Sequence, residues 1–302
     1  ATVSNVAVGF DLLGFSIEGI GDRATVTKTQ SKGQVEIEAI EGLEGLPTDA
    51  RANTASAGLI ELLKERKLPF GFRIRIEKGI PLGSGMGGSA ASAVAAAVAA
   101  NALLESPLGH EELLEYILIG EAVASGSKHG DNVTPCLVGG LVMVTSVEPP
   151  RFVRIPAPGR LWAAVVHPPL EVKTKAARAI LKPEIPLKTH VAQAAKLGGF
   201  LAGCFTDDIS LVAGNLVDLV IEPQRAQLIR GFSEVKQCAL SAGALGCSIS
   251  GAGPAVFALT DGKDRALAVA EAMKAAFAQA SVPGARSWVS SLSNPGARLV
   301  KS

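Results

Sequence analysis

The stretch PLGSGMGGSAASAVAAAVAANALL, residues 81–104, constrains the fold more than any other part of the chain. Glycine stands at positions 83, 85, 87 and 88, and alanine dominates the residues that follow. Glycine allows positive φ and a close approach of the backbone to a bound group, while alanine is the strongest helix former. The stretch therefore predicts a phosphate-sized loop that opens a helix over 89–104. The N–H groups and positive dipole end of that helix favour an anion.

Segments around this loop predict further elements. Residues 71–78 alternate apolar and charged side chains, the period of a half-buried strand, and run directly into the loop. Helices are expected at three more places: residues 111–124, around 189–204, and 223–242. Strands are expected at residues 162–166 and on both sides of a tight turn within 247–260. A cluster of prolines predicts a domain boundary near residue 150.

Composition narrows the class of partner. A chain of 302 residues that is 48% hydrophobic, with mean hydropathy +0.32, is expected to be globular. Its net charge of +1 does not predict a basic surface that would bind nucleic acid or a membrane. The four cysteines show no metal-ligand spacing. We therefore expect a cytoplasmic protein that acts on a small molecule, or one of the plastid stroma if a leader preceded Ala1.

Two common nucleotide-binding loops do not fit the stretch. Gly83, Gly85 and Gly88 form a literal GxGxxG, but the preceding strand alternates instead of being continuously apolar. The expected acidic residue at the tip of a second strand is also missing, since Glu105 lies at a helix end. A Walker A loop is excluded because no GK[ST] follows. By itself, the motif indicates only an anion-binding loop or a tight turn before a closely packed helix.

Residues 80–91, IPLGSGMGGSAA, resemble the ATP-binding signature of the GHMP small-molecule kinases. One position departs from the family pattern, because Gly88 stands where the family usually has the first residue of a serine pair. NVAVGFDLLG at 5–14 and SKHGDNVTP at 127–135 resemble the homoserine kinase branch of that superfamily. Further similar segments span nearly the whole chain: residues 173–178, 222–232, 250–254 and 294–298.

The resemblance implies an α+β, two-domain GHMP kinase fold. An N-terminal ATP-binding α/β domain with a β-α-β loop unit is expected over residues 1–150, and a ferredoxin-like C-terminal domain over 151–302. The implied activity is that of a homoserine kinase, which phosphorylates L-homoserine to O-phospho-L-homoserine in threonine biosynthesis, with ATP and Mg²⁺, as a homodimer. Two alternatives stay open: a GHMP kinase for another small alcohol such as mevalonate or a sugar, and a non-catalytic ligand-binding relative.

The resemblance also implies site residues by position. ATP would contact Asn53, Lys78, Pro81, Gly83, Ser84, Gly85, Met86, Gly87, Gly88, Ser89 and Ala90. Magnesium would be held by Ser89 and Glu121. L-homoserine would contact Asn5, Asp11, His129, Asp131, Arg178 and Arg225. The catalytic set would be Ser89, Glu121, Asn132 and Thr174.

The chemistry of these residue types agrees with an amino-acid substrate. The planar guanidinium groups of Arg178 and Arg225 suit a carboxylate, and the carboxylates of Asp11 and Asp131 suit an ammonium group. Asn132 cannot accept a proton at neutral pH because its side chain is an amide. We therefore expect the hydroxyl proton to pass to the γ-phosphate or to a water, with the site stabilising the transition state.

Overall fold

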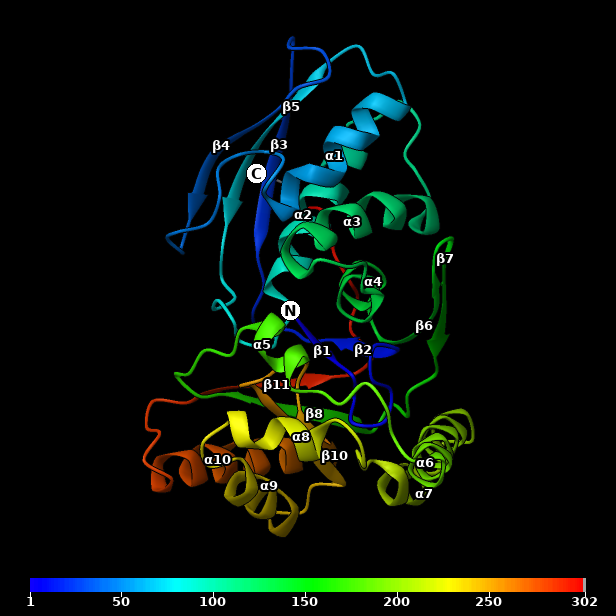
Figure 1. Cartoon of the computed structure of the whole chain (residues 1–302), viewed down its shortest axis with the longest axis vertical. Helices are drawn as coiled ribbons and strands as arrows, with labels where there is room; N and C mark the ends of the chain where they lie inside the picture. Colours follow the sequence, from blue (N-terminus) through cyan, green and yellow to red (C-terminus); the bar gives the residue numbers. More distant parts are fainter. Residues whose placement is uncertain (301–302) are drawn as a thin grey trace.

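A computed structural model describes residues 1–300 of the chain. Figure 1 shows the molecule elongated along one axis, with β3, β4 and β5 beside α1, α2 and α3 in its upper part. Its lower part holds β8, β10 and β11 above α9 and α10, and β1 and β2 lie between the two parts (Figure 1). No helix within residues 1–300 is long and apolar enough to cross a membrane.

The upper part is a three-stranded sheet covered by helices. Its strand order is β3 (Arg23–Thr29), β5 (Gly71–Glu77), β4 (Val35–Glu41), with β3 antiparallel and β4 parallel to β5. Four helices pack with it around one core: α1 (Thr54–Glu65), α2 (Gly88–Asn101), α3 (His110–Ser125) and α4 (Gly130–Val138). On β5, Phe72, Ile74 and Ile76 are buried while the alternating charged residues are exposed. The predicted strand, loop and helix are confirmed.

The lower part and the middle of the molecule are built from two antiparallel sheets. One has the order β1 (Thr2–Ser4), β2 (Leu13–Ser16), β6 (Leu141–Val147), β7 (Pro150–Ile155). The other has the order β11 (Arg286–Ser291), β8 (Leu161–His167), β10 (Val256–Asp261), β9 (Gly246–Ile249). They share a hydrophobic core in which the rings of Phe15 and Phe257 meet edge to face, with centroids 6.0 Å apart.

Helices cover the lower sheets on two sides. α6 (Leu187–Phe205) and α7 (Ile209–Asn215) contribute to the core between the two sheets. α9 (Phe232–Ser241) and α10 (Lys263–Gln279) cover the other face of the β8–β10 sheet. The short α5 (Thr174–Ala179) lies near the middle of the molecule (Figure 1). The predicted helix near 189–204, the strand at 162–166 and the strand pair within 247–260 are confirmed.

The predicted single helix over 223–242 is wrong. The chain instead forms α8 (Glu222–Arg225), a 3-10 turn (Ala226–Leu228) and then α9. Ile229 is extended, and Gly231 has a φ of 83°, so the backbone reverses between the two helices. Helical periodicity alone does not reveal such a break, because the apolar residues on both sides still face the same core.

The predicted boundary near residue 150 falls at the first residue of β7, within the β6–β7 hairpin. The β6–β7 sheet shares its core with strands β8 and β10 of the second half. The division into domains 1–150 and 151–302 therefore stays a prediction.

Candidate active site

The glycine loop between β5 and α2 needs its glycines for space as well as for conformation. Gly83, Gly85 and Gly87 have φ of 57°, 75° and 68°. A Cβ on Gly87 would lie 2.1 Å from Thr2 Oγ1, and one on Gly85 would lie 2.4 Å from the carbonyl oxygen of Ser250. No side chain caps the start of α2, which begins at the end of this loop. The first N–H groups of α2 are therefore available to an anion, and binding of an anion there stays a prediction.

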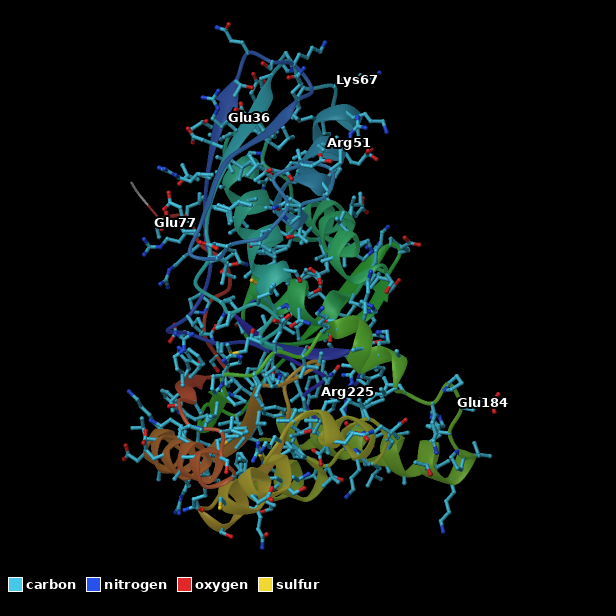
Figure 2. All side chains as sticks on the ribbon, turned by 60° about the vertical axis from the view of Figure 1, so that its left-hand side comes forward. Glu36, Arg51, Lys67, Glu77, Glu184 and Arg225 are labelled. Carbon is cyan, nitrogen blue, oxygen red and sulfur yellow. The ribbon has the colours of Figure 1, made fainter. Side chains whose placement is uncertain are left out.

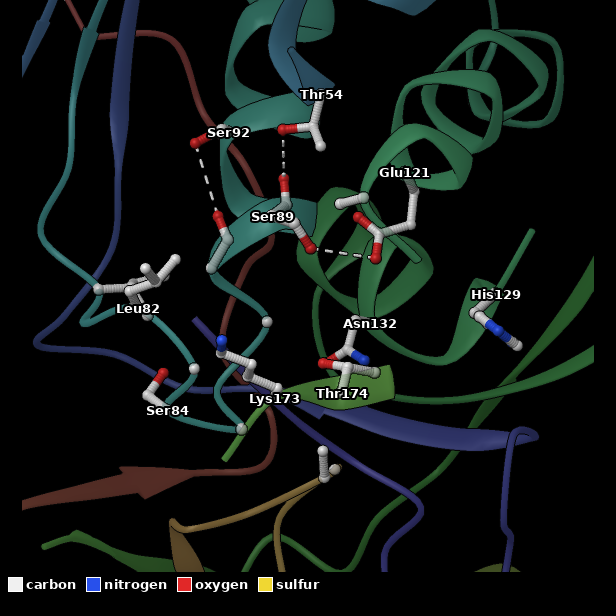
Figure 3. A pocket seen from close by; sticks show the side chains of 18 of the residues that line it. Thr54, Leu82, Ser84, Ser89, Ser92, Glu121, His129, Asn132, Lys173 and Thr174 are labelled. Carbon is white, nitrogen blue, oxygen red and sulfur yellow. Dashed lines mark hydrogen bonds between the residues drawn. The ribbon is translucent and has the colours of Figure 1, made fainter. Parts of the chain in front are cut away.

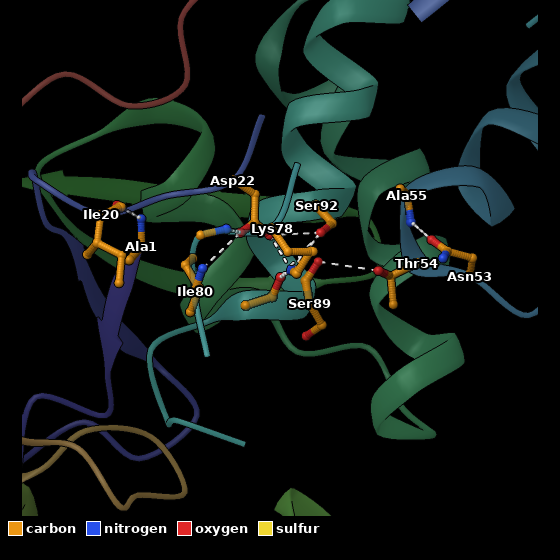
Figure 4. A network of polar contacts seen from close by, with 12 residues as sticks. Ala1, Ile20, Asp22, Asn53, Thr54, Ala55, Lys78, Ile80, Ser89 and Ser92 are labelled. Atoms are coloured by element: carbon orange, nitrogen blue, oxygen red, sulfur yellow. Dashed lines mark hydrogen bonds and ion pairs between the residues drawn. The ribbon is translucent and has the colours of Figure 1, made fainter. Parts of the chain in front are cut away.

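Beneath the loop, a buried ion pair holds the start of α2 (Figure 4). The Lys78 ammonium pairs with Asp22 and donates to the Gly88 carbonyl at 2.7 Å and to Ser92 Oγ at 2.8 Å. Asp22 also accepts from the backbone N–H groups of residues 79 and 80. These contacts position the start of α2, and Lys78 also lines the cavity, so its contact with the nucleotide stays a prediction.

Asn53 shapes the opposite wall of the cavity. It is the N-cap of α1, where its side chain accepts from the Ala55 N–H at 2.9 Å and donates to the Pro47 carbonyl at 2.7 Å. Leu43, Leu46 and Pro47 line the cavity as well. An apolar wall with few fixed polar groups suits a flat aromatic base.

Ser89 and Glu121 meet at the junction of α2 and α3. Ser89 Oγ donates to Glu121 Oε1 at 3.0 Å (Figure 3). Burial raises the pKa of Glu121 to about 7, while the Ser89 hydrogen bond acts in the opposite direction. Asp131 adds a further upward shift, so two carboxylates lie close enough to interact. A cation here would favour the ionised form of both.

Arg178 and Asp11 form a paired fork at the other end of the cavity. The Arg178 guanidinium donates to the two Asp11 oxygens at 3.0 and 2.9 Å. The Phe10 ring lies beneath this guanidinium and beneath that of Arg225, with its centroid 5.3 and 5.2 Å from their central carbons. Arg225 is only 3% exposed, and Figure 2 shows it inside the molecule where the upper and lower parts meet. It donates to the carbonyls of Ala177 and Gly251.

The start of α4 brings three predicted residues to this end. Asp131 is 3% exposed, and burial, with Asp11 nearby, raises its pKa to about 7. Asn132 accepts from Thr2 Oγ1 at 2.8 Å and donates to Ser4 Oγ at 3.1 Å, which fixes the orientation of its amide. His129 Nδ1 lies 4.0 Å from Asp11 Oδ2, and burial lowers the pKa of this histidine.

Asn5 connects the turn that carries Asp11 to the turn that contains Gly251. Its side chain donates to the Gly251 carbonyl at 3.1 Å and accepts from the Asp11 N–H at 3.1 Å. Asn5 and Asp11 both have positive φ, at 69° and 58°. These contacts hold the 5–11 turn in shape and so set the position of Asp11.

A single cavity of about 510 Å³ joins these groups. Besides the residues above, Pro81, Ser84 and Thr174 line it. Met86 and Ala90, two of the predicted ATP contacts, do not line the cavity. Both residues are 0% exposed and lie in the core behind the loop. Sequence reasoning missed Asp22 and Phe10, because their partners lie far away along the chain and no local spacing signals them.

Comparisons with known proteins show the family. The family described as GHMP kinases N terminal domain matches residues 53–140, and GHMP kinases C terminal matches residues 201–279. Homoserine kinase of Xylella fastidiosa (strain 9a5c) is 50% identical over 301 residues, which is 99% of this chain and 92% of that protein. The chain belongs to the homoserine kinase family of the GHMP kinases.

Two further relatives support this membership. Homoserine kinase of Chlorobium phaeovibrioides (strain DSM 265 / 1930) is 44% identical over 312 residues, 99% of this chain and 97% of that protein. The crystal structure of homoserine kinase from Cytophaga hutchinsonii ATCC 33406 has a TM-score of 0.94 at 43% identity, covering 98% of this chain and 94% of that one. The α+β, two-domain GHMP kinase fold expected from the sequence is confirmed.

Proposed function

We propose that this chain transfers the γ-phosphoryl group of ATP to the hydroxyl of L-homoserine, giving ADP and O-phospho-L-homoserine for threonine biosynthesis. One observation carries the proposal: a single cavity combines an anion-binding helix start with paired groups of both charges. A substrate that is a zwitterion with a hydroxyl needs both charges at one end and a phosphate site at the other.

ATP would bind along the glycine loop. The backbone N–H groups of residues 85–89 would hold its phosphates, since Gly85, Gly87, Gly88 and Ser89 line the cavity beside the uncapped start of α2. The base would lie against the apolar wall near Asn53.

The donor set beside the loop fits magnesium. Ser89 Oγ and Glu121 Oε1 are oxygen donors 3.0 Å apart on neighbouring helices, and Mg²⁺ prefers oxygen ligands and retains several waters. When bound, the ion would neutralise phosphate charge. Burial keeps the pKa of Glu121 high, so we expect magnesium to bind in exchange for a proton near neutral pH.

L-homoserine would bind at the Arg178 end. Its carboxylate would take hydrogen bonds from Arg178, whose fork is held by Asp11 in the structure, and it would lie near the buried guanidinium of Arg225. Its ammonium would be drawn to Asp11 and Asp131, with His129 alongside. The substrate would thus share the existing ion pair instead of creating a new one.

Asn132 and Thr174 would position the reacting hydroxyl. Both line the cavity, and Asn132 is held by Thr2 and Ser4. An amide and a hydroxyl cannot serve as a base at neutral pH. The hydroxyl proton would therefore pass to an oxygen of the transferred phosphoryl group while the site stabilises the transition state.

The test is ADP release from Mg-ATP with a panel of acceptors: L-homoserine, L-serine, L-threonine, mevalonate, galactose and none. We expect release with L-homoserine alone. Release only with mevalonate or a sugar would support kinase activity but refute L-homoserine as the acceptor. No release of ADP with any acceptor would favour a non-catalytic ligand-binding relative. Size-exclusion chromatography would test the homodimer, which so far rests on the resemblance alone.

A further inference from the structure

The segment before α5 packs directly on the glycine loop. The Val172 N–H donates to the Gly83 carbonyl at 3.1 Å, and a Cβ on Gly83 would lie 2.4 Å from Glu171 Cγ. Lys173 follows as the N-cap residue of α5, with extended backbone angles. Its backbone is therefore held by the loop on one side and by a helix on the other.

The Lys173 side chain lies at the junction between the two ends of the cavity. It lines the same cavity as the loop glycines and the acceptor residues. Figure 3 shows its ammonium directed toward the glycine loop, between Ser84 and the pair Asn132 and Thr174. This is the region where a phosphoryl group would pass from a nucleotide on the loop to a hydroxyl near Asn132.

Three other cations of the cavity are already occupied by protein groups. Lys78 pairs with Asp22, Arg178 pairs with Asp11, and Arg225 donates to two backbone carbonyls. The Lys173 side chain makes no ion pair or hydrogen bond within residues 1–300, so the three N–H donors of its ammonium are available to a ligand. Lys175, two residues further on, also lines the cavity and is equally without such a partner in that part of the chain.

We propose that Lys173 is a further catalytic residue, whose ammonium binds the phosphoryl group during transfer. The inference rests on the proposed function. In the step, the bond between the γ-phosphorus and the bridging oxygen breaks and ADP leaves with the electron pair. The acceptor hydroxyl oxygen forms the new bond to phosphorus, and its proton moves to an oxygen of the transferred group. Lys173 keeps its own proton throughout and donates hydrogen bonds to the non-bridging oxygens.

This role follows from where charge must be neutralised. Phosphoryl transfer depends on positioning and electrostatic stabilisation, and removing one fixed donor or cation from such a site typically costs about 10²–10³-fold in kcat. The N–H groups at the start of α2 would contact the phosphates of the nucleotide, while Lys173 reaches the phosphoryl group from the start of α5. A cation on that side neutralises the group as it leaves the loop.

The first test compares Lys173→Met with Lys188→Met as a matched control, because Lys188 is exposed on α6 and does not line the cavity. We expect Lys173→Met to lower kcat about 100-fold, with KM for L-homoserine changed less than about threefold, and Lys173→Arg to recover part of the loss. Lys188→Met should keep kcat within about threefold of the unaltered protein. Equal effects of the two methionine variants, or an effect of Lys173→Met on KM alone, would refute the proposal.

A second measurement separates this inference from the proposed function. Titration calorimetry would measure binding of MgADP with and without aluminium fluoride, a mimic of the phosphoryl group in transfer. We expect Lys173→Met to weaken the fluoride-dependent gain in affinity about 100-fold while leaving MgADP affinity unchanged. An unchanged gain would overturn the role of Lys173 even if L-homoserine is turned over. A lost gain would support it even if another alcohol proves to be the acceptor.

Discussion

At the scale of single residues, the acceptor end depends on the geometry of one guanidinium. Arg178 holds Asp11 by two parallel hydrogen bonds, and a lysine can offer only a point charge there. Losing one charge-assisted hydrogen bond costs about 1.5–3 kcal/mol. We therefore expect Arg178→Lys to raise KM for L-homoserine roughly 10- to 150-fold in steady-state assays, with KM for ATP unchanged.

Arg160 supplies a matched control for this prediction. It forms a similar two-contact pair with Asp261 on the surface, outside the residues that line the cavity. Arg160→Lys should leave both KM values unchanged. A comparable rise of KM in both variants would show that the fork of Arg178 has no special role in substrate binding.

His167 should make the stability of the protein depend on pH. It ends β8 in a buried position, and burial, with Arg286 nearby, lowers its pKa to about 4. The imidazole of an unfolded chain titrates near about 6.5, so folding favours the neutral form. The stabilisation that comes from keeping this imidazole neutral is fully present above about pH 6.5, and it is lost as pH falls toward 4.

The measurement is the free energy of unfolding of the unaltered protein and of His167→Gln between pH 7 and 4.5. We expect the difference between the two proteins to shrink by about 1–2 kcal/mol over this range, allowing for solvent screening. Carboxylates that titrate in the same range affect both proteins equally. A constant difference would show that burial does not hold this imidazole neutral.

At the scale of elements, the atoms packed around the glycine loop decide which of its positions require glycine. Gly87 has positive φ and no room for a Cβ, whereas Gly88 begins α2 and a Cβ there would lie 3.3 Å from Ile80 Cγ2. We expect Gly87→Ala to lower stability by at least about 1 kcal/mol and to weaken MgADP binding. Gly88→Ala should be tolerated and keep nucleotide affinity, as thermal unfolding and calorimetry would report. Equal losses in both variants would contradict this account.

The buried pair beneath the loop joins three elements. Asp22 precedes β3, Lys78 follows β5, and their contacts end on the first turns of α2. Asp22→Asn would leave the Lys78 ammonium buried without a counter-ion, which typically costs about 3–5 kcal/mol. We expect this variant to have a lower free energy of unfolding in urea, and the double variant with Lys78→Met to recover much of it. No recovery would mean that the uncompensated charge is not the cause.

At the scale of the whole molecule, the two halves of the chain share one core. Val3, Phe15 and Leu141 pack in the same cluster as Val165 and Phe257. Asn294, near the end of the described chain, exchanges 2.6 Å hydrogen bonds with the side chain and backbone of Ser16. A cut near residue 150 would therefore expose apolar surface on both fragments.

We expect the full chain to unfold in one cooperative transition in scanning calorimetry, and fragments 1–150 and 151–302 to show none when expressed separately. Heat should instead aggregate each fragment. A sharp transition in either fragment alone would show that the predicted boundary separates independent folding units.

The amino-acid sequence by itself determined the local elements that have strong periodicity or strong breakers. The alternation of 71–78, the glycines of 83–88 and the alanines that follow predict strand, loop and helix, because side-chain periodicity and backbone preferences depend on residues close in sequence. The motifs also indicated the family, and nearly all the residues they singled out line one cavity.

Only the tertiary structure decided which charges are occupied and which are available. Lys78 and Lys173 both lie beside the loop, yet Asp22 pairs with the ammonium of Lys78 and no described residue pairs with that of Lys173. It likewise decided that Phe10 lies beneath two guanidinium groups and that Met86 turns into the core. These outcomes depend on contacts between residues far apart in the chain. Electrostatic and packing energies act through distance in space, which spacing along a sequence does not encode.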